Sequence, residues 1–157
     1  MKIDTMRLVN HLNEVLEIRV NKYSYENSVN SYFDSDALDA TLIIEKGDGH
    51  FERELKFMTV EQIELMDEWL TMVSTSKGTL KTLNFVDVDL EFMKSFRGNT
   101  PHIKIVLSDL YEEWTKTPIS WDFIINKKNV HLMGMELQKT MKEFPCRCGM
   151  KHNCHKL

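Results

Sequence analysis

Short segments in which apolar and polar residues alternate one by one recur through this 157-residue chain and constrain its fold more than any other feature. Alternation with a period of two puts every second side chain on one face of a strand, so each segment predicts a strand buried on that face. The segments that alternate most clearly are 16–20, 38–44, 51–57, 103–107 and 121–125. Between the second and third of them, Gly47-Asp48-Gly49 predicts the turn of a β-hairpin.

The alternation changes phase between two further short segments. Residues 83–85 follow one phase and residues 88–92 the other, so the slip at Val86-Asp87 predicts a bulge or a tight turn between two strands. Residues 1–14 have apolar positions near helical spacing, but the pattern is weak and assigns no element there.

Two segments have the period of a helix instead. Thr59 and Gln62 form a capping box, in which each side chain satisfies a free backbone donor of the first turn. The apolar stripe that follows is Ile63, Met66, Leu70 and Val73. Near the end of the chain Asn129 is predicted to be the N-cap of a second helix, whose apolar stripe runs to Phe144 before Pro145 ends it.

These elements predict an α+β fold. Short links favour antiparallel neighbours, and no strand–helix–strand repeat of a parallel sheet is present. We expect a twisted antiparallel β-sheet packed with two main helices, with two facing sheets as the alternative arrangement. Residues 1–144 form a single domain in this interpretation, and residues 145–157 form a short C-terminal tail.

Composition and charge exclude several classes of protein. With 42% apolar and 28% charged residues the chain is globular, and no apolar run approaches a membrane span or has the layout of a signal peptide. We therefore expect a cytoplasmic protein without a membrane partner. All 24 acidic residues but only 17 of the 20 basic ones precede the tail, so residues 1–144 carry a net charge of −7. This charge disfavours nucleic acid and favours a basic protein partner, although simple solubility also explains it.

All three cysteines of the chain and two of its six histidines lie in the tail. Zinc binds four thiolate or imidazole ligands in a tetrahedron, and the predicted ligands of a structural zinc site are Cys146, Cys148, Cys154 and His155. His152 is an alternative fourth ligand. A reduced tail with free thiols is the simpler interpretation, and a disulfide would leave one cysteine unpaired.

The tail also resembles the SEC-C motif, a small zinc-binding element found at the ends of many bacterial proteins. The resemblance rests on Pro145-Cys146-x-Cys148-Gly149, Lys151 and Cys154-His155. The sequence departs from the motif between Gly149 and Cys154, where the linking stretch is shorter.

The sequence contains none of the common catalytic motifs. It has no glycine-rich phosphate loop, no nucleophile elbow and no HExxH helix, so we predict no catalytic residues and a protein that is not an enzyme.

Residues 1–144 resemble the WapI-type immunity proteins of bacterial contact-dependent toxin systems. The resemblance is carried by 16–20, 36–44, 59–62, Trp69-Leu70, 86–92, Phe144-Pro145 and Arg147. Ala37 is a departure, because the family tends to have tryptophan there. The resemblance implies a non-enzymatic protein that binds and blocks one cognate toxin domain.

A long polar and aromatic stretch, residues 21–36, is the predicted surface for such a partner. Its candidate contact residues are Tyr23, Tyr25, Tyr32, Asp34 and Asp36. The aromatic side chains pack on the core in the competing interpretation. The competing function is a cytoplasmic adaptor that docks a larger partner through its SEC-C-like tail.

Overall fold

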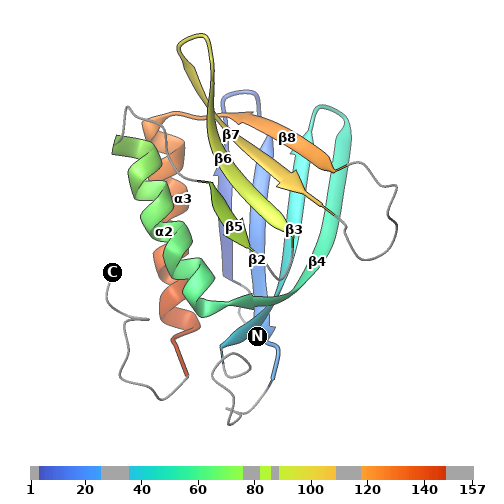
Figure 1. Cartoon of the computed structure of the whole chain (residues 1–157), viewed down its shortest axis with the longest axis vertical. Helices are drawn as coiled ribbons and strands as arrows, with labels where there is room; N and C mark the ends of the chain where they lie inside the picture. The colour runs from blue at the N-terminus through green and yellow to red at the C-terminus, as the bar shows by residue number, and fades with distance from the viewer. Residues whose placement is uncertain (1–3, 26–35, 76–81, 86–88, 109–117, 148–157) are drawn as a thin grey trace.

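The computed structural model describes residues 4–25, 36–75, 82–85, 89–108 and 118–147. In these residues eight strands and two helices follow one another in the order ββββαββββα (Figure 1). Their bounds are β1 Asp4–Val9, β2 Val15–Tyr23, β3 Ala37–Lys46, β4 Gly49–Thr59, α2 Val60–Thr75, β5 Leu83–Phe85, β6 Leu90–Arg97, β7 Thr100–Leu107, β8 Ile119–Ile124 and α3 Lys127–Glu143. The predicted α+β class is confirmed.

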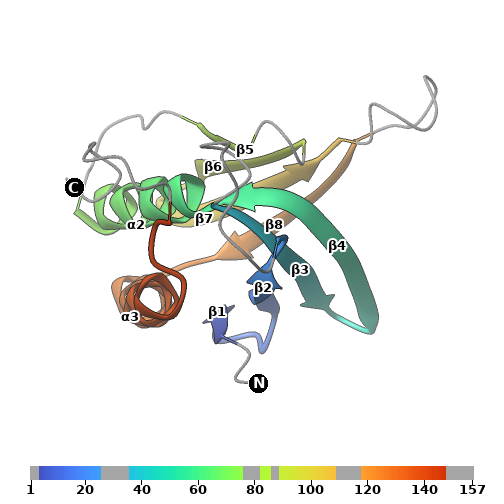
Figure 2. The same ribbon diagram turned by 90° about the horizontal axis from the view of Figure 1, so that it is seen from below.

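The strands form two four-stranded antiparallel sheets in the order of the chain, β1-β2-β3-β4 and β5-β6-β7-β8. The two sheets face each other, and α2 and α3 lie together along one side of them (Figure 2). The alternative of two facing sheets is therefore the arrangement observed. No helix in the described parts of the chain is long and apolar enough to span a membrane.

The core lies between the sheets and under the helices. Phe85, Phe92 and Phe123 are fully buried on the inner face of the second sheet. Phe92 makes edge-on ring contacts with Phe85 at 5.5 Å and with Trp69 of α2 at 6.1 Å between centroids. Each sheet thus buries its alternating apolar face against the other, as the period of two predicts.

The capping box at the start of α2 is confirmed. The Thr59 amide donates to Gln62 Oε1 at 2.9 Å, and the Gln62 amide donates to Thr59 Oγ1 at 3.2 Å. The predicted N-cap of α3 was wrong, because Asn126 caps this helix and Asn129 lies three residues inside it. The two asparagines bond each other's backbone amides reciprocally, so both side chains belong to one capping box.

The sequence analysis assigned no element to residues 1–14, and the structure has a strand there. Residues 4–9 form β1, which pairs with β2 in continuous register from Asp4 opposite Val20 to Val9 opposite Val15. Met6 and Leu8 are fully buried, and their spacing of two is that of a strand. The apolar positions of so short a segment fit the period of a helix as well as that of a strand. The pairing with β2 decides that the segment is a strand.

Candidate functional site

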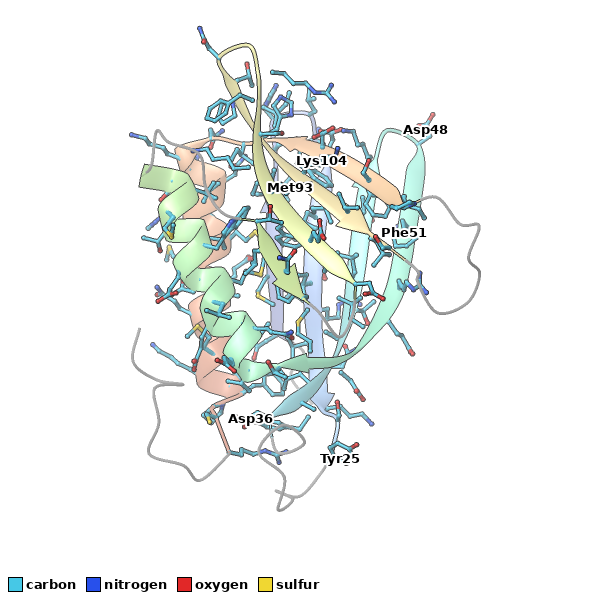
Figure 3. All side chains as sticks on the ribbon, viewed as in Figure 1. Tyr25, Asp36, Asp48, Phe51, Met93 and Lys104 are labelled. Carbon is cyan, nitrogen blue, oxygen red and sulfur yellow. The ribbon has the colours of Figure 1, made fainter. Side chains whose placement is uncertain are left out.

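The chain leaves α3 and crosses the start of β3 and the end of β2, where it is held by a cluster of contacts. We call this cluster the tail junction; it consists of Tyr23, Tyr25, Asp36 and residues 144–147. Figure 3 labels Asp36 and Tyr25, which lie at the same end of the molecule. The junction contains three of the predicted partner-binding residues and the first predicted zinc ligand.

Asp36 is the centre of the junction. It is only 6% exposed, and its backbone oxygen accepts the amide of Val60, the first residue of α2, at 3.1 Å. Its carboxylate accepts two further hydrogen bonds, from the Cys146 thiol to Oδ2 at 2.9 Å and from the Arg147 amide to Oδ1 at 2.5 Å. A single buried acid therefore connects β3, α2 and the residues after α3.

Tyr23 forms the second half of the junction. Its hydroxyl donates to the carbonyl of Pro145 at 2.5 Å, and its ring meets Phe144 edge-on at 5.4 Å between centroids. Burial raises the pKa of Tyr23 to about 12, with further increases from the charges of Asp36 and Cys146 and an opposing decrease from Arg147. Burial outweighs the nearby cation because removing water disfavours the phenolate.

Arg147 lies over Tyr23 at the surface of the junction. Its guanidinium carbon lies 3.5 Å from the centroid of the Tyr23 ring, which is a cation–π contact. One guanidinium nitrogen also donates to the carbonyl of Tyr25 at 2.9 Å, whereas the Tyr25 side chain is 39% exposed. The junction thus offers one free aromatic side chain next to a positively charged one.

Several predicted site residues lie outside the described residues. They are Tyr32, Asp34, Cys148, His152, Cys154 and His155. Among the described residues no three histidine, cysteine, aspartate or glutamate side chains are grouped to hold a metal ion, and Cys146 is the one predicted zinc ligand that belongs to this part of the chain. The zinc site therefore stays a prediction.

The sequence analysis did not find how Tyr23 and Asp36 are held. Their partners Pro145 and Cys146 lie 122 and 110 positions away in the chain, directly after α3. No periodicity relates positions so far apart. The only available signal was Arg147 itself, a cation beside the first cysteine of an otherwise separate motif.

A pocket of about 290 Å³ lies at another place, between the end of α2, β6, β7 and the start of α3. The amine of Lys94 donates to the carbonyl of Val73 at 2.9 Å there and lies 5.2 Å from the centroid of the Phe96 ring. The described residues that line it include no carboxylate, histidine or cysteine, and their titratable side chains are those of Lys94 and Lys127.

Comparison with known protein families gives a match over most of the chain. The model of the WapI-like immunity protein family matches residues 7–145, from β1 through both sheets and both helices to the junction. The chain belongs to this family. No curated protein and no solved structure matches it. The family match ends at Pro145, directly before Cys146, so it gives no support to the SEC-C resemblance of the tail.

Replacing Asp36 by alanine tests the role of this buried carboxylate. The change removes the acceptor of the Cys146 thiol and of the Arg147 amide, and a hydrogen bond to a charged group contributes about 1.5–3 kcal/mol. We expect a fall of that size in the free energy of unfolding and faster hydrogen exchange at the Arg147 amide. Asp39→Ala in β3 is the control, because the Asp39 carboxylate accepts a hydrogen bond from the Ser24 hydroxyl instead. Equal losses of stability in Asp36→Ala and Asp39→Ala would contradict the central role of Asp36 in the junction.

Tyr23 is expected to ionise above the ordinary pH range of a tyrosine, and the near-ultraviolet tyrosinate signal follows this step. Its pKa of about 12 exceeds the ordinary value of 10.0, so its contribution to stability is complete below pH 10 and is lost as the pH rises from 10 to about 12. Tyr23→Phe should remove the late step of the titration, and Tyr25→Phe should leave it. The opposite result would show that the late step belongs to another tyrosine.

Proposed function

We propose that this protein is an immunity protein that binds the toxin domain of its own system and blocks it without chemical turnover. The family match over residues 7–145 supports this proposal most directly, because it covers the whole described fold rather than one motif. Contact with a protein partner needs an exposed surface and no reactive group.

The charge of the chain favours a basic toxin. Residues 1–144 carry a net charge of −7, and complementary charge accelerates the encounter of two proteins. The protein acts in the cytoplasm in this proposal, where a toxin domain that has entered the cell meets it.

The tail junction contributes to partner binding through its exposed part. Asp36 is buried and its carboxylate is engaged within the chain, so its part is to hold the junction together. Tyr25 is exposed beside the Arg147 side chain and is the group that a partner contacts. We retain Tyr32 and Asp34 as contact residues on the strength of the sequence.

The second part of the proposal is that the tail binds a structural zinc ion. Its ligands are Cys146, Cys148, Cys154 and His155, with His152 as the alternative to His155. Support comes from the clustering of these residues and from the half-buried position of Cys146 at the junction. The Cys146 thiol donates a hydrogen bond to Asp36, whereas a zinc ligand is a thiolate, which has no hydrogen to donate. Metal binding and this hydrogen bond therefore exclude each other, and zinc binding would loosen the junction.

Cys148→Ser tests the proposed ligand set. We expect the zinc content of the purified protein to fall well below one ion per chain while the circular dichroism spectrum of the folded domain is unchanged. His131→Ala is the control, because His131 is an exposed histidine on α3 that is not in the proposed ligand set. Retention of one zinc per chain in Cys148→Ser would show that the ligand set is wrong.

Growth rescue tests the immunity function itself. The product of the gene directly upstream is expressed in a sensitive host, with and without this protein. We expect toxicity that co-expression relieves, because binding sequesters the toxin. Toxicity that co-expression leaves unchanged would contradict the proposal.

Deletion of residues 148–157 separates the immunity function from the adaptor alternative. This deletion leaves Cys146 and Arg147, which hold the tail junction. An immunity protein of the proposed kind keeps its rescue without these residues. Loss of rescue with a folded domain would favour docking through the tail.

A further inference from the structure

A groove of about 300 Å³ runs between the edge strand β1 and helix α3, at a distance from the tail junction. Figure 2 shows α3 lying beside β1 at the end of the first sheet. The residues that line the groove are Arg7, Val9, Asn129, Leu132, Met135, Glu136 and Lys139. Of the described residues in the tail and in the predicted partner-binding stretch 21–36, none lines the groove.

The floor and rim of the groove expose apolar side chains from both elements. Val9 is 40% exposed, Leu132 49% and Met135 48%, and Leu12 in the turn after β1 is 55% exposed. Single exposed aliphatic groups are ordinary on a protein surface, but a group of them around one groove marks an interaction site.

The backbone of β1 is available along the same groove. β1 pairs with β2 on one edge, and the Arg7 amide points away from β2, since it donates to Glu136 Oε2 of α3 at 2.6 Å. Antiparallel pairing directs the amides of every second residue to the same edge, so those of Thr5 and Val9 also point outward. An edge of this kind accepts an added strand.

The contact of Glu136 shows that the open edge of β1 fits a hydrogen-bond acceptor. Its carboxylate already occupies the position of an acceptor on the Arg7 amide, as the backbone carbonyl or acidic side chain of an added strand would. The helix thereby also protects the edge from unspecific pairing. A partner strand has to displace the Glu136 carboxylate from the Arg7 amide, at the edge that α3 covers in part.

The other charges around the groove are positive. The Arg7 side chain is 49% exposed and reaches Glu17 only at 3.6 Å, and Lys139 is exposed on α3. The charge of Glu136 is directed at the Arg7 amide. The groove therefore complements acidic side chains, although the chain as a whole is acidic.

We propose that the groove binds an extended segment of the toxin in which acidic and aliphatic residues alternate, by adding a strand to β1. Backbone hydrogen bonds to the outward amides give affinity, Leu132 and Met135 receive an aliphatic side chain, and Arg7 with Lys139 selects the acids. This inference rests on the proposed function for the identity of the partner. The six residues of β1 limit the pairing to a short segment.

Val9→Pro tests strand addition. Proline removes the outward amide but no bond to β2, and edge strands tolerate proline on their open side. We expect an unchanged circular dichroism spectrum and at least a tenfold weaker affinity for the toxin domain in calorimetry. Val9→Ala keeps the amide and should lose less affinity for the toxin domain than Val9→Pro. Equal affinity of the wild type and a folded Val9→Pro variant would overturn the proposal.

Charge reversal gives a second test that does not touch the strand. Lys139→Glu should weaken toxin binding about tenfold or more and make it less sensitive to salt. Lys104→Glu, on the outer face of the second sheet (Figure 3), carries the same change in charge away from the groove and should have little effect. Equal losses of affinity in the two variants would mean that net charge alone determines toxin binding. That result would exclude the groove as the binding site.

A third measurement separates this inference from the proposed function. Blocked hexapeptides that alternate valine with aspartate are titrated into the isotope-labelled protein, with peptides that alternate valine with lysine as the matched set. We expect the aspartate peptides alone to shift the amide resonances of Thr5, Arg7 and Val9. Absence of these shifts would overturn the groove as a binding site, whether or not the toxin binds.

The outcomes are distinguishable from failure of the immunity function. Peptide shifts at β1 without any toxin binding would support the groove and reject the function. Rescue and toxin binding that survive Val9→Pro and Lys139→Glu would support the function and reject the groove. Dimerisation that Val9→Pro abolishes would identify a second copy of the chain as the occupant, against the proposal.

Discussion

The structure depends on the burial of two apolar sheet faces against each other. Each sheet presents one alternating face, and neither face is stable in water until the other covers it. Phe85, Phe92 and Phe123 are fully buried on this inner surface, and Trp69 of α2 extends the layer to the helices. At the other side of the molecule, Phe51 of β4 and Trp121 of β8 approach to 4.8 Å between ring centroids and connect the two sheets.

This arrangement leaves the edges and ends of the sheets for interaction. α3 lies along β1 and covers its open edge in part, through the carboxylate of Glu136 on the Arg7 amide. The chain then turns back to the start of β3, where Asp36 binds Cys146 and Arg147. The two surfaces that we assign to partner binding are thus consequences of where one helix begins and ends.

The junction shows how far the sequence led to the candidate site. Tyr23 and Asp36 were selected because aromatic and acidic residues gather in a polar stretch, and Cys146 because cysteines cluster. The sequence did not indicate that these two groups contact each other, nor that burial of Asp36 gives it an internal role. The groove at β1 was missed altogether, because residues 1–14 fit helical spacing and β1 was not recognised as a strand.

By itself, the sequence determined the class of the fold, most strands and the capping box of α2, because periodicity and capping act within a few residues. The same locality explains the displaced N-cap of α3, since Asn126 and Asn129 differ only in the backbone around them. Only the tertiary structure decided that the strands divide into two facing sheets, that β1 is a strand and that the residues after α3 bind Asp36. These features depend on contacts between distant parts of the chain, whose free energy no local pattern contains.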